Sequence, residues 1–209
     1  ATLSVPEQTY LWTHQITGND PDRLYFANKR AWTEMNVNGR TATEAGSARY
    51  NCDANWTIDA QITTEVLGSL AVGMRQQAAD LAGALGGITN DGFPVHAAQF
   101  YAAMYADAPF TADVETIVAR GLEVVPTGSW TREIIEQAQT LHANAGTDLL
   151  PDRTALLAFV NQRGRDDRFW VEAASNVGMT TLAILHGQGD FKATVEYGVR
   201  GGEDSDCNP

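Results

Sequence analysis

The clearest structural signal in the sequence is the stretch TADVETIVARGL at residues 111–122. Its apolar side chains recur at the i, i+3, i+4 and i+8 spacing that places them on one face of an α-helix. They are Val114, Ile117, Val118 and Leu122. Thr111 is positioned to cap the start of this helix, and Gly121 with Pro126 ends it. The stretch therefore predicts an amphipathic helix with one buried face.

Similar periodicity extends along most of the chain on both sides of this stretch. Apolar residues at helical spacing occur in residues 78–85, 134–141, 156–160 and 177–185. Phe100 and Met104, with alanines around them, predict a further helix that packs closely against its neighbours. Strict alternation of apolar and polar residues, the pattern of a half-buried strand, is scarce. The sequence therefore predicts an all-α fold in a single domain over residues 1–209.

The first 60 residues carry weaker patterns. Turn clusters at residues 19–22 and 37–40 bracket a predicted helix from about Arg23 to Met35. Residues 46–55 have little periodicity and predict an irregular loop, a kind of segment that often carries binding groups. Since the first residue is alanine, we expect the chain to begin after processing or partway through a longer gene product.

Composition excludes several function classes. The chain has 14 Lys+Arg against 26 Asp+Glu, giving a net charge of −12, and its only lysines are Lys29 and Lys192. It lacks the basic stripe that binds a nucleic-acid backbone. No apolar run reaches the roughly 18 residues of a membrane span. The two cysteines, Cys52 and Cys207, allow at most one disulfide bond, and the sequence leaves their pairing open.

The most informative stretch for function is GGEDSDCNP at residues 201–209. It places Asp204 and Asp206 two residues apart beside two glycines. Such a pair can direct both carboxylates at one Mg²⁺, Mn²⁺ or Ca²⁺ ion, whose charge offsets their mutual repulsion. Acidic turns of this composition are also common as solvated loops, so the Asp-x-Asp pair alone does not decide the function.

The order of motifs leading to this stretch resembles the ADP-ribosylglycohydrolase family, of the dinitrogenase-reductase-activating glycohydrolase type. The resemblance rests on Asn176, ILHGQGDF at 184–191 and GGEDSDCN at 201–208, preceded by IDAQI at 58–62, LGSLAVG at 67–73 and TNDG at 89–92. It implies a compact orthogonal bundle of helices. The family's upstream Gly-Asp…Glu element and the helices that follow the Asp-x-Asp have no counterpart, so we expect the chain to lack both family flanks.

The resemblance also implies a chemistry. Family members hold two Mg²⁺ or Mn²⁺ ions and hydrolyse the bond between the anomeric ribose carbon of ADP-ribose and an acceptor. Asp204 and Asp206 would be metal ligands and catalytic groups, with one of them activating water. Further ligands implied at the metal site are Glu7, with Gln8 and Thr9 as weaker ones, and Cys207, which replaces the usual Thr or Ser.

On the substrate side, the resemblance implies contacts from Asn90, Asp91 and Gly92, and from Asp59 and Asn55. Each has a structural alternative. Asn-Asp-Gly is strong turn chemistry, and an aspartate such as Asp59 is favoured at a helix N-terminus. The four histidines show no ligand spacing, and we expect each to be satisfied locally. They are His14, His96, His142 and His186.

The leading hypothesis is a metal-dependent hydrolase of an N- or O-linked ADP-ribosyl group, acting on an ADP-ribosylated protein or a small ribosyl substrate. Departures from the family pattern at Pro6, Gln8 and Cys207 support a rival, a non-catalytic binding or structural protein whose metal site has decayed. A third reading is a secreted helical domain with a Ca²⁺-stabilised acidic turn. The sequence leaves metal identity, oligomeric state and compartment open, although the resemblance slightly favours a cytoplasmic protein over an exported one.

Overall fold

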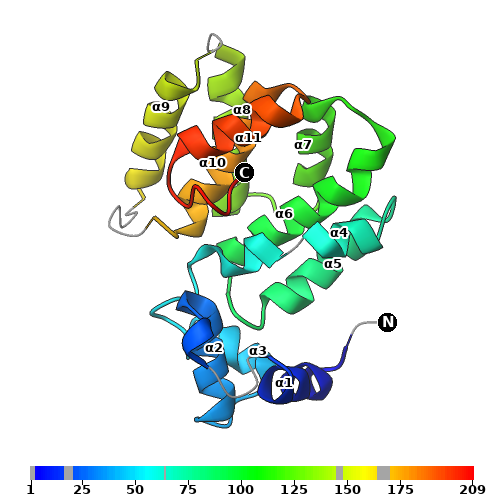
Figure 1. Cartoon of the computed structure of the whole chain (residues 1–209), viewed down its shortest axis with the longest axis vertical. Helices are drawn as coiled ribbons and strands as arrows, with labels where there is room; N and C mark the ends of the chain where they lie inside the picture. Colours follow the sequence, from blue (N-terminus) through cyan, green and yellow to red (C-terminus); the bar gives the residue numbers. More distant parts are fainter. Residues whose placement is uncertain (1–2, 17–20, 64, 145–147, 164–169) are drawn as a thin grey trace.

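The computed structural model describes residues 3–16, 21–63, 65–144, 148–163 and 170–209, and the prediction of an all-α fold is confirmed (Figure 1). The described residues form eleven α-helices and three short 3-10 helices, and their only β-pairing is an isolated bridge between Thr57 and Glu172. In the described part of the chain, no helix combines the length and apolar character needed to cross a bilayer.

The helices follow one another along the chain with short connections. They are α1 (Val5–His14), η1 (Pro21–Arg23), α2 (Phe26–Asn36), α3 (Ala42–Gly46), η2 (Ile58–Thr63), α4 (Glu65–Leu70), α5 (Arg75–Gly86), α6 (Phe93–Asp107), η3 (Ala108–Phe110), α7 (Val114–Leu122), α8 (Trp130–Asn144), α9 (Leu149–Asn161), α10 (Ala173–Gly187) and α11 (Phe191–Gly201).

The stretch at residues 111–122 forms α7, with Val118 and Leu122 buried as its periodicity predicts. Its cap is Asp113, not the predicted Thr111, because Asp113 Oδ1 accepts a hydrogen bond from the backbone N–H of Glu115 at 3.2 Å. The Thr111 hydroxyl instead accepts from the N–H of Asp113. Capping by side-chain oxygen thus fixes the start of the helix two residues later than expected.

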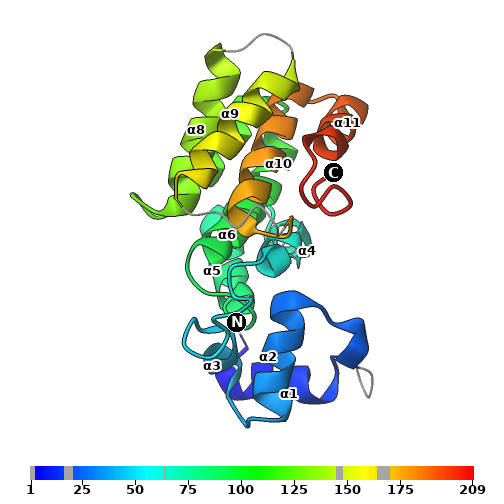
Figure 2. The same ribbon diagram turned by 90° about the vertical axis from the view of Figure 1, so that its left-hand side faces the viewer.

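Helices α6 to α11 enclose the main hydrophobic core, whereas α1, α2 and α3 gather at the other end of the molecule (Figures 1 and 2). Helix α10 lies at the centre of this core and contacts α8, α9 and α11. The largest fully buried side chains of the core come from several helices. They include Phe100, Ile134, Ile135, Leu156, Met179 and Leu182. The predicted close packing around Phe100 and Met104 is confirmed, since both are buried on α6.

A second core consists almost entirely of alanines, where η2, α4 and α5 pack on α6. Small side chains let these helix backbones approach closely. At Gly68 of α4 the approach is closest, because an added Cβ would lie 2.6 Å from the carbonyl oxygen of Ala102 and would also collide with Cβ of Tyr105. At Gly83 of α5 an added Cβ would meet only the flexible end of Gln99, at 2.9 Å from Nε2.

This difference gives a matched pair of stability variants. Gly68→Ala is expected to lower the free energy of unfolding by about 1–2 kcal/mol, because overpacking against backbone outweighs the gain of about 1 kcal/mol in helix propensity. Gly83→Ala keeps most of that gain because Gln99 can move aside. Urea denaturation measures both; equal shifts in the two variants would show that the α4–α6 approach does not limit stability.

Candidate functional site

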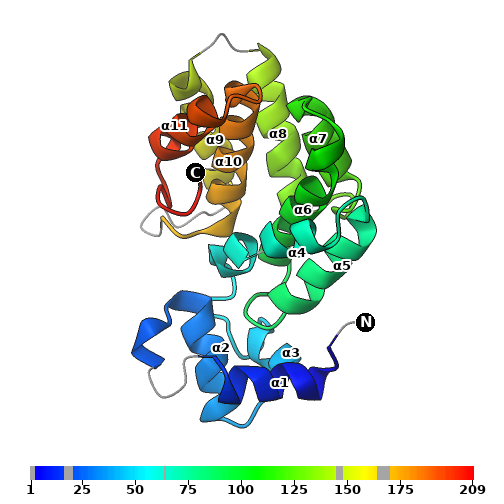
Figure 3. The same ribbon diagram turned by 45° about the vertical axis from the view of Figure 1, so that its right-hand side comes forward.

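The acidic motif predicted from the sequence forms a tight turn directly after α11. Gly202 and Glu203 have φ values of +74° and +59°, a left-handed conformation that reverses the chain. The backbone N–H groups of Cys207 and Asn208 both donate to the carbonyl oxygen of Asp204, at 3.1 and 2.9 Å. The turn therefore folds around Asp204, beside α10 and α11 (Figure 3).

Asn176, in the first turn of α10, holds this turn in place. Its side chain is fully buried, and its Oδ1 accepts hydrogen bonds from the Asp204 N–H at 3.0 Å and from Asn208 Nδ2 at 2.7 Å. Its Nδ2 group donates to the carbonyl oxygens of Trp170 and Glu172 at 2.8 and 2.7 Å. Both ends of the amide are thus used, and Asn176 is the positioning residue of the acidic turn.

The short helix η2 brings Asp59 towards the same turn. Asp59 is 5% exposed, its Oδ1 accepts from the N–H of Asn28 at 3.0 Å, and its Oδ2 lies 2.5 Å from the Thr57 hydroxyl. Burial raises the pKa of Asp59, against the opposing effect of these hydrogen bonds. The negative charge of Asp59 in turn contributes to a raised pKa at Asp204 and at Cys207, so the three groups share one electrostatic environment.

Asp204 is the electrostatic centre of the cluster. Its side chain is 3% exposed, and ligand atoms of Asp204, Asp206 and Cys207 all lie within 4.8 Å of one another. Burial, followed by the hydrogen bond with Asp206, raises the pKa of Asp204 to about 6. Burial and a hydrogen bond to Asp204 raise the pKa of Cys207 to about 12, so Cys207 is a neutral thiol at pH 7.

The donor set suits a hard divalent cation. Asp204 Oδ1 is buried and has no hydrogen-bond partner among the described residues. A buried carboxylate oxygen without a partner lowers the stability of the folded state. The carboxylates of Asp204 and Asp206 also repel each other, and the charge of Asp59 adds to this effect. A Mg²⁺ or Mn²⁺ ion bound to these oxygens would relieve both effects, so the residues present fit such an ion.

Asn90 lies close to this region in a structural role. Its Oδ1 accepts from the N–H of Ala60, and its Nδ2 donates to the carbonyl oxygens of Asn55 and Thr57, all at 3.0 Å or less. The amide therefore fixes the loop that carries Asp59. Of the other residues implied to bind substrate, Asn55 contributes this carbonyl oxygen, and any contact of its side chain with substrate stays a prediction.

Asp91 and Gly92 form the turn that starts α6. Asp91 Oδ2 accepts from the N–H of Ala48 at 2.9 Å, and Gly92 adopts φ +68° at the helix start. Both line a separate cavity of about 330 Å³, together with His96 and Gln99. Their role in substrate binding also stays a prediction.

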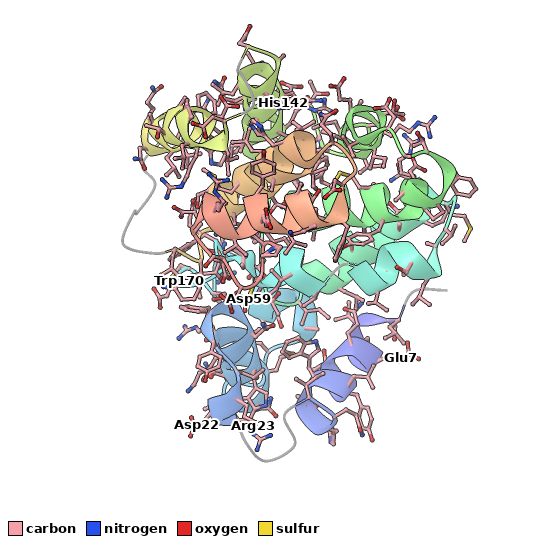
Figure 4. The ribbon with its side chains drawn as sticks, turned by 45° about the horizontal axis from the view of Figure 1, so that its top comes forward. Glu7, Asp22, Arg23, Asp59, His142 and Trp170 are labelled. Atoms are coloured by element: carbon pink, nitrogen blue, oxygen red, sulfur yellow. The ribbon has the colours of Figure 1, made fainter. Side chains whose placement is uncertain are left out.

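The structure does not bring Glu7, Gln8 and Thr9 to the acidic turn. Glu7 forms a capping box with Ser4, Gln8 donates to the carbonyl oxygen of Leu3, and Thr9 Oγ1 accepts from the N–H of Ala42. They belong to α1, at the lower end of the molecule in Figures 1 and 2, whereas the C-terminal turn lies higher, beside α10 and α11, and Figure 4 shows Glu7 apart from Asp59.

An apolar cavity of about 310 Å³ adjoins the acidic turn. Its walls come mainly from α6, α10 and α11, and the turn itself contributes Cys207 and Asn208. Aromatic and aliphatic side chains dominate the lining, among them Tyr101, Met104, Ile184 and Phe191. A planar apolar group could occupy this cavity with its polar end directed at the carboxylates.

One family model matches nearly the whole chain. Residues 7–209 match the family model described as ADP-ribosylglycohydrolase. No curated protein and no solved structure gives a match. The matched region includes Asp59, Asn176 and the acidic turn, as well as α1 from Glu7 onward.

Proposed function

The chain therefore belongs to the ADP-ribosylglycohydrolase family, and on this premise we propose that it is a Mg²⁺- or Mn²⁺-dependent hydrolase of a glycosidic bond between ADP-ribose and a nitrogen or oxygen atom of an acceptor. The observation that supports metal dependence best is the unpartnered buried oxygen of Asp204, close to Asp206 and within the field of Asp59. No described residue donates a hydrogen bond to this oxygen, and a divalent cation bound there would stabilise the negative charge of the carboxylate.

The buried and the exposed carboxylate of the acidic turn would have different roles. Asp204, buried and held by the Asn176 network, would be the fixed metal ligand. Asp206 is exposed at the edge of the turn, so its carboxylate can hold the cation and can also accept a proton from an attacking water. A bound divalent cation would supply Lewis-acid polarisation of the ribose oxygens and a lowered pKa for that water.

The neighbouring cavity supports a nucleotide substrate. Its apolar lining, which includes Phe191 and Tyr101, suits the adenine ring. Because Cys207 also lines the cavity, the distal ribose of a nucleotide bound there would lie near the carboxylates. Binding energy gained in the cavity would then position the scissile bond at the acidic turn.

The direct test is release of ADP-ribose from peptides that are ADP-ribosylated on arginine or on serine, followed by chromatography. We expect turnover of at least one linkage with 1 mM Mg²⁺ or Mn²⁺, as an assay condition, and its loss on adding EDTA. Use of both peptides separates N-linked from O-linked specificity. Absence of turnover of both peptides with either metal would contradict the proposed activity.

The rival is a protein of the same family that binds ADP-ribose without cleaving it. One observation favours it: the ligands implied for the second side of the metal site form other hydrogen bonds. Glu7 and Gln8 bond to residues at the start of α1, and Thr9 bonds to the first residue of α3. Calorimetry with free ADP-ribose distinguishes the two, because the rival predicts saturable binding together with no turnover of either peptide.

A further inference from the structure

A second group of metal-ligand side chains lies at the far end of α10, away from the acidic turn. It consists of His142 in the last turn of α8, Asp152 in the first turn of α9 and His186 in the last turn of α10. One ligand atom from each lies within 4.8 Å of the others. Figure 4 marks His142 at the end of the molecule opposite to Glu7.

The core of this group is a buried pair. His186 Nε2 lies 2.9 Å from Asp152 Oδ2, and the two side chains are only 2% and 6% exposed. The ring of His142 packs edge-on against the ring of His186, with 4.8 Å between centroids. These two atoms, an imidazole nitrogen and a carboxylate oxygen, are both of the types that bind metal ions.

His142 has properties that the pair alone does not explain. Its Nδ1 atom is buried and has no hydrogen-bond partner among the described residues. Burial, followed by the nearby His186, lowers the pKa of His142, so the ring is neutral and able to bind a metal at neutral pH. The carboxylates that act on it are Glu115 of α7 and Asp152, which favour a cation nearby.

We propose that His142, Asp152 and His186 form a zinc site that joins the ends of α8, α9 and α10. Two imidazoles and one carboxylate are a typical set of three protein ligands for Zn²⁺, with a fourth position left for water. With bonds of about 2.0–2.1 Å, ligands of a tetrahedral ion lie about 3.3 Å apart. Donor atoms already within 4.8 Å need only small side-chain movements to reach that geometry.

The other ring nitrogen of His142 faces Gln188. The Nε2 atom of this exposed residue lies 3.4 Å from His142 Nε2. An ion bound at Nδ1 would leave this contact in place, and a water molecule can complete its coordination. The site is separate from the acidic turn, because His186 lies ten residues beyond Asn176 on α10, about 15 Å along the helix axis.

Such an ion would stabilise the packing of three helices. The three ligands come from the C-terminal ends of α8 and α10 and from the N-terminal end of α9, so one ion would hold three helices of the main core at a single point. Because the ion binds only the folded arrangement, its binding energy adds to the stability of the folded state.

The test titrates Zn²⁺ into zinc-free protein by calorimetry. The double variant Asp204→Asn/Asp206→Asn serves as background, with excess Mg²⁺ present, so that the acidic turn does not contribute. We expect one equivalent of Zn²⁺ to bind and the melting temperature to rise by about 5–10 °C at a hundredfold excess over Kd. Co²⁺ in place of Zn²⁺ should give the visible absorption of a tetrahedral nitrogen and oxygen site.

Ligand variants decide between this site and binding elsewhere. His142→Gln, at a half-buried position, should weaken Zn²⁺ binding by about a hundredfold or more, and Asp152→Asn tests the buried pair with little change in shape. His14→Gln on α1 is the matched control and should bind like the parent. Equal Zn²⁺ affinity in His142→Gln and His14→Gln, or no stoichiometric binding by the parent, would overturn the proposal.

Discussion

Asp204→Asn is expected to reduce the rate of ADP-ribose release about a thousandfold, equivalent to about 4 kcal/mol of transition-state stabilisation. The reason is local. Asp204 is the buried carboxylate of the cluster, and its Oδ1 has no hydrogen-bond partner in the described part of the chain, so it is the oxygen best placed to bind a cation. An amide keeps the shape and loses the charge, and Mn²⁺ affinity measured by calorimetry should fall in parallel.

The same substitution should make the metal-free protein more stable, although it lowers activity. The pKa of Asp204 is raised to about 6, so its ionised form is disfavoured in the folded protein. Without metal, the unfolded chain releases this proton near pH 4 and the folded chain near pH 6, so stability falls as pH rises between these values. At pH 7.5 in EDTA, the Asp204→Asn variant should therefore have a higher melting temperature than the parent. Its free energy of unfolding should be greater by at most about 3 kcal/mol.

The parent protein in EDTA should also gain stability when the pH is lowered from 7.5 to 5, and the variant should gain less. Asp80→Asn, at an exposed aspartate whose carboxylate accepts a local bond from Gln76, is the control. Full activity of Asp204→Asn would show that Asp204 does not bind the catalytic cation. An unchanged pH profile of its stability would show that Asp204 does not carry the buried charge.

Asn176→Ala is expected to destabilise the protein by about 3–5 kcal/mol and to lower activity about ten- to a hundredfold. The amide of Asn176 makes four hydrogen bonds in a fully buried position, two to the acidic turn and two to carbonyl oxygens near the start of α10. Alanine leaves the Asp204 N–H and the Asn208 amide without this partner and leaves a cavity beside them. The turn then loses its fixed position relative to Asp59.

Urea denaturation and the hydrolysis assay measure the two effects separately. The matched control is Asn36→Ala at the exposed end of α2, where the amide donates one bond within its own helix, to the carbonyl oxygen of Trp32. An Asn176→Ala protein with parental stability would contradict the buried network. If instead stability falls while kcat stays unchanged in the remaining folded protein, Asn176 does not position the catalytic turn.

The helices were predictable wherever one face is apolar and the other polar. Helix α7 is the best example, because its apolar residues match the helical period and a glycine precedes its end. The start of α2 was less predictable, since the expected helix from Arg23 begins at Phe26 and Pro21–Arg23 forms a separate 3-10 turn. Around α1 and α3 the periodicity is short, and contacts between the helices determine the structure there.

The candidate site was predictable where its residues are neighbours in sequence. Asp204 and Asp206 stand two residues apart, whereas the positioning role of Asn176 depends on a hydrogen bond that spans 28 residues. Each histidine was expected to be satisfied locally, and His186 does have a partner, but that partner, Asp152, lies 34 residues earlier in the sequence. The three side chains proposed as zinc ligands lie on three different helices, so no sequence spacing indicates them.

The position of the acidic turn after α11 has a consequence for synthesis. Because chains leave the ribosome from the N-terminus, Asp59 and Asn176 emerge before the segment that they will hold. The alanine-rich core precedes Asp204 and Asp206 in the chain, so its helices can pack before these two carboxylates have been made. A nascent chain that stops before Asp204 lacks the acidic turn, so any activity that depends on the turn would begin only after the residues beyond α11 have docked against Asn176.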